Sequence, residues 1–188
     1  MHNERCIHNP NLFVITGGPG SGKTTLLLEL ERHGYPFAPE VAREIIHEQV
    51  KQGGTALPWA NRALFAELML QRSVDLFMAH AATTSVTFVD RGIPDSLCYA
   101  RLMGLPDLKI RNACDNYRYA QRVFLAPFWR EIYVTDSERK QDVEEAERTA
   151  ELMGTIYREC GYEVIEVPKM VPEKRADFVL QNLISTGR

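Results

Sequence analysis

The sequence lacks long apolar runs, paired cysteines and clustered basic charge. Among its 188 residues, no apolar run approaches the roughly 18 residues that a membrane-spanning helix needs. The N-terminal stretch MHNERCIHNPN is polar and charged, without the apolar core of a signal peptide. These absences predict a cytoplasmic protein that does not span a membrane.

The charge pattern argues against a nucleic-acid partner, and the cysteine pattern argues against a metal site or a disulfide framework. The formal net charge is −3, with Lys and Arg mixed among Asp and Glu along the chain. Because affinity for a nucleic-acid backbone needs clustered basic side chains, no nucleic-acid partner is expected. The cysteines at 6, 98, 114 and 160 form no C-x-x-C pair, which favours free thiols over a metal site or a disulfide framework.

Apolar β-rich runs alternate with helical patterns along the chain. Strands are predicted at 11–16, 35–40, 85–90, 122–127 and 162–168. Helices are predicted at 22–34, 41–54, 59–80, 94–104, 106–118, 137–161 and 173–184. This alternation predicts an α/β fold, a parallel sheet with helices on both faces. No repeat or linker is visible, so we expect one domain over residues 1–188, with 1–10 flexible.

Residues 17–24 match the phosphate-loop pattern G-x-x-x-x-G-K-[ST], with an expected strand before them and an expected helix after them. Backbone N–H groups of such a loop converge on phosphate oxygens, and its glycines allow the close approach. Lys23 should reach the β- and γ-phosphates, and the Thr24 hydroxyl should ligate Mg²⁺. The expected nucleotide-binding residues are Gly17, Gly18, Pro19, Gly20, Ser21, Gly22, Lys23, Thr24 and Thr25.

A second candidate site follows the predicted strand at 85–90, which ends in Asp90 and continues into Arg91. Ligands bind at the carboxyl edge of such parallel sheets, so Asp90 is placed to hold Mg²⁺ through water, opposite Thr24. Arg91 could neutralise charge on a transferred phosphoryl group or bind the acceptor. The alternative is an ordinary Asp-Arg-Gly surface turn.

Glu40 and Arg43 form a third candidate site after the short segment 35–40. Their i, i+3 spacing places both on one face of the predicted helix. Glu40 could take a proton from an acceptor hydroxyl, and Arg43 could orient that acceptor. The alternative is that Glu40 only favours the start of the helix electrostatically.

Cations in the segment 128–142 are candidates for a lid over the phosphates. Arg130, Arg139 and Lys140 could stabilise the transition state and exclude water, with Arg139 the preferred candidate. A solvated helix face is the alternative, because many Glu residues surround them.

Several motifs of other phosphate-loop proteins are missing. Switch GTPases carry a D-x-x-G and an N-K-x-D, whereas here Asp90 is followed by Arg-Gly-Ile and no Asn-Lys pair occurs. A transporter-type Ser-Gly-Gly signature is also absent, and Arg91 stands where motor ATPases usually have a catalytic Glu. These absences weaken the switch and motor hypotheses.

The phosphate loop, EVARE (40–44), VDRG (89–92) and WREIYVTDSERKQD (129–142) together resemble the predicted AAA-type ATPase/kinase family of NadR-like and TRPL-translocation-defect-like proteins. The similarity runs from about residue 12 to residue 168. It implies a three-layer α/β/α P-loop NTPase fold like that of nucleoside and nucleotide kinases, with five parallel strands in the order 2-3-1-4-5 and a kinase-like lid. A more distant similarity to deoxynucleoside kinases implies that Glu40 is the base.

We therefore expect an ATP- and Mg²⁺-dependent phosphotransferase acting on a small hydroxyl- or phosphate-bearing metabolite, with GTP as a possible substitute for ATP. The residues expected to act in transfer are Lys23, Glu40, Asp90, Arg91 and Arg139. Two rival hypotheses stay open: a nucleotide-dependent ATPase or GTPase switch for a protein or lipid partner, and a binding module without turnover. Neither the acceptor nor the oligomeric state follows from the sequence.

Overall fold

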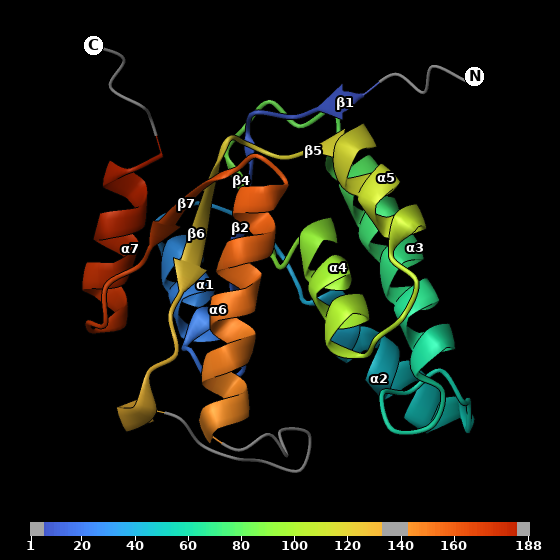
Figure 1. Ribbon diagram of the computed structural model, residues 1–188. Helices are drawn as coiled ribbons and strands as arrows, with labels where there is room; N and C mark the ends of the chain where they lie inside the picture. The colour runs from blue at the N-terminus through green and yellow to red at the C-terminus, as the bar shows by residue number, and fades with distance from the viewer. Residues whose placement is uncertain (1–5, 133–142, 184–188) are drawn as a thin grey trace.

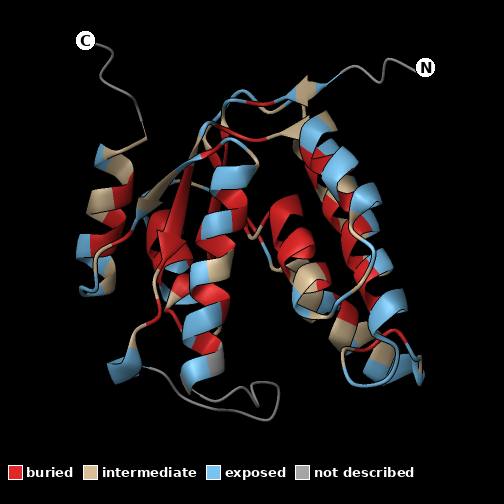
Figure 2. Cartoon of the chain, in the orientation of Figure 1, coloured by how far each residue is buried: buried red, intermediate tan, exposed pale blue. Residues whose placement is uncertain are grey.

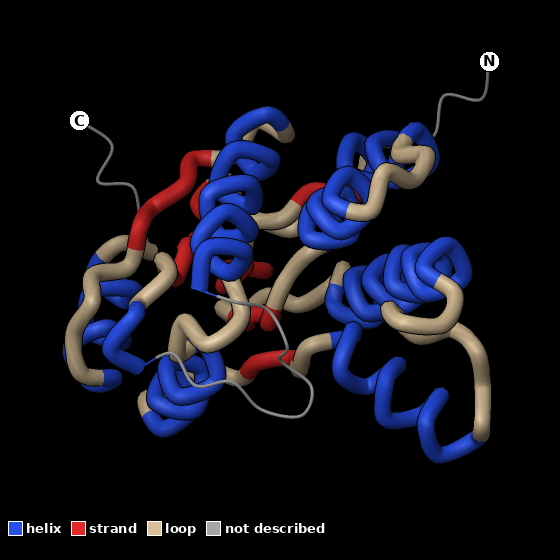
Figure 3. The backbone as a smooth tube through the Cα atoms, turned by 60° about the horizontal axis from the view of Figure 1, so that its bottom comes forward, coloured by secondary structure: helices blue, strands red, loops and turns tan. Residues whose placement is uncertain are grey.

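The computed structural model describes residues 6–132 and 143–183. Its strands and helices, in chain order, are β1 (Ile7–His8), β2 (Leu12–Gly17), α1 (Lys23–Arg32), β3 (Phe37–Ala38), α2 (Val41–Gln52), α3 (Arg62–His80), β4 (Thr87–Asp90), α4 (Ile93–Leu102), α5 (Leu108–Asn116), β5 (Tyr117–Arg118), β6 (Arg122–Ala126), the 3₁₀ helix η1 (Arg130–Ile132), α6 (Val143–Glu159), β7 (Glu163–Glu166) and α7 (Pro172–Gln181). Figure 1 shows this arrangement, and the turned view in Figure 3 shows the helices packed around the strands.

Five parallel strands form the central sheet, in the order β3-β4-β2-β6-β7. Counted along the chain, this is the order 2-3-1-4-5, so the predicted three-layer α/β/α fold and its strand order are confirmed. The central strand β2 pairs with two neighbours, and Ile15 lies opposite both Asp90 and Phe124. Because all five strands are parallel, their carboxyl ends share one edge of the sheet, where the expected site residues follow.

Side chains of the central strand alternate between two hydrophobic cores, as the twofold period of a strand requires. Phe13 and Ile15 pack with residues of α1 and α7, whereas Leu12 and Val14 pack with residues of α3, α4, α5 and α6. Figure 2 shows that the inner strands β2, β4 and β6 and the helix sides facing them are mostly buried, whereas the edge strand β7 is not. Both faces of the sheet are therefore covered by helices, and its carboxyl edge is left for the loops that carry the site residues.

The structure describes the N-terminal segment from residue 6 onward, and the expectation that residues 1–10 are flexible stays a prediction. Ile7–His8 pair in parallel with β5, a strand that replaces the end of the helix predicted at 106–118. Asn9 is buried, and its Nδ2 donates to the carbonyl oxygen of His80 over 2.9 Å. This hydrogen bond ties the start of the described chain to the end of α3.

One helix boundary also differs from the sequence pattern. The helix predicted over 59–80 begins at Arg62, because Asn61 caps it by accepting a hydrogen bond from the Leu64 N–H over 3.0 Å. The lid candidates Arg139 and Lys140 lie outside the described residues. In the ranges that are described, no helix is long and apolar enough to cross a membrane.

Candidate functional site

The phosphate-loop sequence forms the turn between β2 and α1. Gly17, Gly20 and Gly22 have φ values of 139°, 71° and 77°, which strongly favour glycine. A Cβ at Gly17 would also collide with the carbonyl oxygen of Ala126 at the end of β6. The Ser21 hydroxyl donates to the Gly18 carbonyl over 2.8 Å and braces the turn. The glycines at these positions are thus required by the backbone itself.

Lys23, the first residue of α1, folds back over this loop. Its Nζ donates to the carbonyl oxygens of Gly17 and Gly18, both over 3.0 Å, and the side chain is buried. Burial, followed by the charge of Arg91, lowers the pKa of Lys23 to about 8. The ammonium group therefore lies in the loop with neutral partners, as expected for a lysine that binds phosphate.

The residues available for Mg²⁺ are Thr24 and Asp90. Thr24 is exposed and lines the cavity described below, whereas Asp90 is buried and is not among the lining residues. The Asp90 Oδ1 atom has no hydrogen-bond partner among the described residues. Burial raises the pKa of Asp90, with the charge of Lys23 acting in the opposite direction. A hydroxyl and an unpaired carboxylate oxygen are suitable donors for Mg²⁺, so this pair fits the ion.

Arg91 follows β4 in a left-handed conformation with a φ of 72°, which is rare for a residue other than glycine. Its Nε donates to Glu40 Oε1 over 2.8 Å, and its Nη1 donates to Asp95 Oδ1 over 3.0 Å. Burial opposes the charge of Arg91, but Glu40, Asp95 and Asp90 outweigh that effect and raise its pKa. Two carboxylates therefore hold the guanidinium of Arg91, whose backbone is in the left-handed conformation.

Asp95 is a site residue that the sequence reasoning missed. It is 4% exposed, and its Oδ1 accepts from Thr16 Oγ1 over 2.7 Å in addition to Arg91. Its Oδ2 accepts from the Gly92 N–H over 2.9 Å and from the Tyr157 hydroxyl over 2.6 Å. The i, i+4 spacing from Arg91 was a usable signal, because a helix start places such residues together. Asp95 thus joins β2, α4 and α6 behind the site.

The structure brings Glu40 and Arg43 together with Arg91. Glu40 precedes α2, and its Oε2 lies 3.5 Å from Arg43 Nε. Burial favours the neutral acid, but Arg91, Lys23 and Arg43 outweigh it and lower the pKa of Glu40. Glu40 is therefore ionised at neutral pH, and it is a weaker base than an unpaired glutamate.

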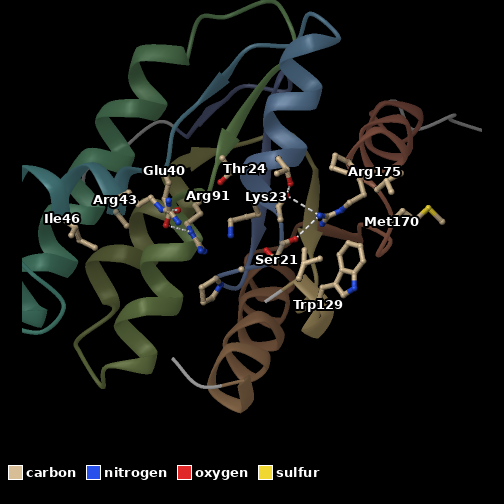
Figure 4. Close-up of a pocket in the computed structure, with 18 residues that line it drawn as sticks. Ser21, Lys23, Thr24, Glu40, Arg43, Ile46, Arg91, Trp129, Met170 and Arg175 are labelled. Carbon is tan, nitrogen blue, oxygen red and sulfur yellow. Dashed lines mark hydrogen bonds and ion pairs between the residues drawn. The ribbon is translucent and has the colours of Figure 1, made fainter. Parts of the chain in front are cut away.

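One cavity of about 650 Å³ connects these groups with a second region (Figure 4). Residues 19–25 of the phosphate loop and α1 line its middle, and Glu40, Ala42, Arg43, Ile46 and Arg91 line one end. The other end is lined by Trp129, Ile132, Met170, Val171, Pro172 and Arg175. We call these the carboxylate end and the α7 end. The carboxylate end and the α7 end thus belong to one cavity, and the phosphate loop lies between them.

The lid candidate Arg130 and three aromatic side chains of the helical region lie away from the cavity lining. Arg130 is exposed in η1 and does not line the cavity, although Trp129 and Ile132 on either side of it do. Trp59 is 63% exposed, and Phe65 packs edge to face on Tyr99 at 5.2 Å between ring centroids. Neither Trp59, Phe65 nor Tyr99 is a lining residue, so these rings do not form the cavity wall.

The family comparison matches most of the chain. The model described as AAA domain matches residues 12–175. No curated protein matches the chain in a sequence comparison.

Solved structures of kinase-like proteins resemble the fold. A NadR protein in complex with NR is 19% identical, with a TM-score of 0.66 and coverage of 91% of this chain and 49% of that one. Shikimate kinase from Acinetobacter baumannii in complex with shikimate is 18% identical, with a TM-score of 0.58 and 91% coverage of both chains. Deoxyadenosine kinase from M. mycoides with bound dATP is 14% identical, with a TM-score of 0.54 and coverage of 92% and 98%. This chain therefore spans about half the length of the NadR chain, and at these identities the likeness shows the fold alone.

Proposed function

The chain belongs to the AAA domain family, and on that premise we propose that it transfers the γ-phosphoryl group of MgATP to a small metabolite, nucleoside-like or nucleotide-like, that carries a hydroxyl or phosphate group. The observation that carries this proposal is one continuous cavity with the phosphate loop in its middle. A nucleotide alone would contact the loop and one end. The other end leaves room for an acceptor beside the terminal phosphate.

The nucleotide would lie on the loop and the α7 end. Lys23 would exchange its two carbonyl partners for β- and γ-phosphate oxygens, which are stronger acceptors for an ammonium group. Trp129 and the apolar side chains of Met170 and Val171 offer a surface for the base. Because the sequence carries no guanine-reading N-K-x-D motif, we favour ATP and keep GTP as a possible substitute.

Thr24 would ligate Mg²⁺ directly, and Asp90 would hold it through water. When bound, Mg²⁺ neutralises charge on the phosphate oxygens. The unpaired Oδ1 of Asp90 supports this role, because a buried carboxylate oxygen without a partner is costly unless a ligand or water satisfies it.

The acceptor would lie at the carboxylate end. Glu40 is ionised and can accept the proton of an acceptor hydroxyl, and Arg43 can orient the acceptor. Arg91 is held by Glu40 and Asp95 with its positive charge already in place, so it would stabilise charge on the transferred group without reorganising.

The second function that stays open is a regulatory NTPase for a protein or lipid partner, because the same phosphate loop would serve it. Acceptor dependence separates the two functions. ADP formation should be measured with MgATP alone and with a panel of nucleosides, nucleotides and cofactor precursors. Phosphotransfer predicts that at least one compound raises the rate, whereas a rate unaffected by every compound favours the regulatory NTPase.

A further inference from the structure

Arg175 of α7 is a buried cation in the wall of the cavity, and no sequence motif marks it. The residue is 2% exposed. Its Nη1 donates to the carbonyl oxygen of Ser21 over 3.0 Å and approaches that of Gly22 at 3.4 Å. Figure 4 shows the side chain extending from α7 onto the phosphate loop. Its Nε atom has no hydrogen-bond partner in the described ranges.

The positive charge of Arg175 has no acidic partner among the described residues. The guanidinium also lies over the Trp129 ring, whose centroid is 6.0 Å from the guanidinium carbon. Burial alone lowers the pKa of Arg175, with no opposing carboxylate. An uncompensated buried charge is costly, and proteins normally pair it with an acid, a metal-bound group or a ligand. The structure therefore indicates that the compensating charge comes from a molecule in the cavity.

The contrast with Lys23 locates that molecule more closely. Lys23 interacts electrostatically with Asp90, Glu40 and Asp95 at the carboxylate end, where the terminal phosphate is expected. Arg175 contacts the loop at Ser21 and Gly22 and lies beside Trp129, at the α7 end. The two cations thus serve different parts of an extended anion.

The packing at Gly22 shows how closely Arg175 approaches the loop. A Cβ at Gly22 would lie 2.7 Å from Arg175 Nη1 and 3.6 Å from Thr25 Oγ1. The guanidinium is therefore fixed against the first turn of α1, whose backbone N–H groups favour an anion.

We propose that Arg175 binds the phosphate group nearest the nucleoside, the α-phosphate, of the bound nucleotide. This inference rests on the nucleotide binding in the proposed function and is independent of whether the phosphate is transferred. It assigns to α7 a direct role in binding, through a charge that no acid of the described residues compensates.

The competing explanation is that Arg175 only holds the phosphate loop through the two carbonyl groups. That role predicts a loss of stability in the ligand-free protein when the guanidinium is removed. The proposal predicts little loss of stability. Removing the guanidinium breaks two hydrogen bonds, but it also removes the cost of a buried charge without an acidic partner.

The test compares R175Q with wild type and with K174Q, which removes an exposed charge from the same helix. Calorimetry gives Kd values for MgATP and MgADP, and urea unfolding of the ligand-free proteins gives their midpoints. We expect R175Q to weaken both nucleotides by the same factor, about 10- to 100-fold, because both carry an α-phosphate. The unfolding midpoint should stay close to wild type, and K174Q should change neither quantity.

Three results would overturn the inference: unchanged Kd values in R175Q, a loss confined to MgATP, or a lowered unfolding midpoint that accounts for the lost affinity. R175K provides a second variant, since it keeps the charge and should recover part of the affinity for both nucleotides. Failure of the wild-type protein to bind either nucleotide would instead contradict the proposed function, so the two failures are distinguishable.

Discussion

The two ends of the cavity differ in how their charges are balanced. At the carboxylate end, Arg91 is paired with Glu40 and Asp95 at 2.8 and 3.0 Å. At the α7 end, Arg175 donates to carbonyl groups and lies over the Trp129 ring, and no acid in the described part of the chain pairs with it. Charges balanced within the chain hold side chains in a fixed geometry before ligand arrives, as catalysis requires. A buried cation without an acidic partner instead favours the binding of an anionic ligand, because the ligand supplies the missing charge. The difference predicts that the two ends respond differently to mutation.

The largest effect is expected from K23A in the middle of the cavity. Loss of the ammonium group that faces both Gly17 and Gly18 carbonyls should lower turnover about 10³-fold and weaken MgATP binding. Steady-state ADP formation and calorimetry measure the two effects. K51A, an exposed lysine on α2, serves as the control. Unchanged binding and turnover in K23A would show that the phosphates lie elsewhere.

D95N should have the next largest effect, because it breaks the balance at the carboxylate end. The variant weakens the pairing with Arg91 and disturbs acceptors used by Thr16 and Tyr157. We expect the free energy of unfolding to fall by about 3 kcal/mol, the low end for a broken buried pair, since Glu40 still holds Arg91. Urea unfolding checks this against D75N, an exposed acid on α3. A midpoint shift no larger than that of D75N would exclude Asp95 as an anchor of this end.

E40Q separates chemistry from binding at the same end. Turnover with a true acceptor should fall about 10²-fold, the lower limit for a general base, because the pKa of Glu40 is already lowered. The Kd for MgATP should change little. The matched control is E48Q, which removes a carboxylate of α2 that pairs with Arg72 outside the cavity. Turnover near the wild-type rate would leave Glu40 without a role as base.

The smallest effect is a proton taken up with the nucleotide. Burial lowers the pKa of Lys23 to about 8, and phosphate groups would raise it again on binding. At pH 8 about half of the Lys23 side chains are neutral in the ligand-free protein, so binding should take up about half a proton. Calorimetry in buffers of different ionisation enthalpy measures this uptake, and K23R should abolish it, since arginine stays charged.

The same shift has a consequence for stability. The pKa of Lys23 is about 8 in the folded protein and near 10.5 when unperturbed. Between these values the unfolded chain binds more protons, so this group makes the free energy of unfolding rise with pH in that window.

For the proton-uptake experiment, equal uptake by wild type and K23R would contradict the placement of Lys23 in the phosphate site.

The parts predicted from the sequence are those encoded by consecutive residues. The phosphate loop needs glycines at fixed positions, and Asp90 and Glu40 follow strands whose ends share one edge of a parallel sheet. That the fold brings Glu40 near Arg91 follows from this edge, although the ion pair itself joins residues 51 positions apart. The position of a residue at the end of a strand is therefore predictable, because the carboxyl ends of all strands in a parallel sheet lie at one edge.

The parts that escaped prediction depend on how helices pack. Arg175 lies in a helix whose pattern resembles any amphipathic C-terminal helix, and only its docking against α1 brings the guanidinium to Ser21. Trp129 belongs to the segment predicted as a lid, but its contact with the cavity depends on the path of the chain after β6. Phe65 of α3 and Tyr99 of α4 pack edge to face between the two helices.

The central claim is that two substrates meet at one phosphate. It is tested most directly by following the γ-phosphate of radiolabelled MgATP in the presence of hydroxyl- and phosphate-bearing metabolites, with products separated by chromatography. The proposed function predicts that label appears in a new organic phosphate and that E40Q reduces its formation. Release of all label as inorganic phosphate, at a rate independent of every added metabolite, would contradict it.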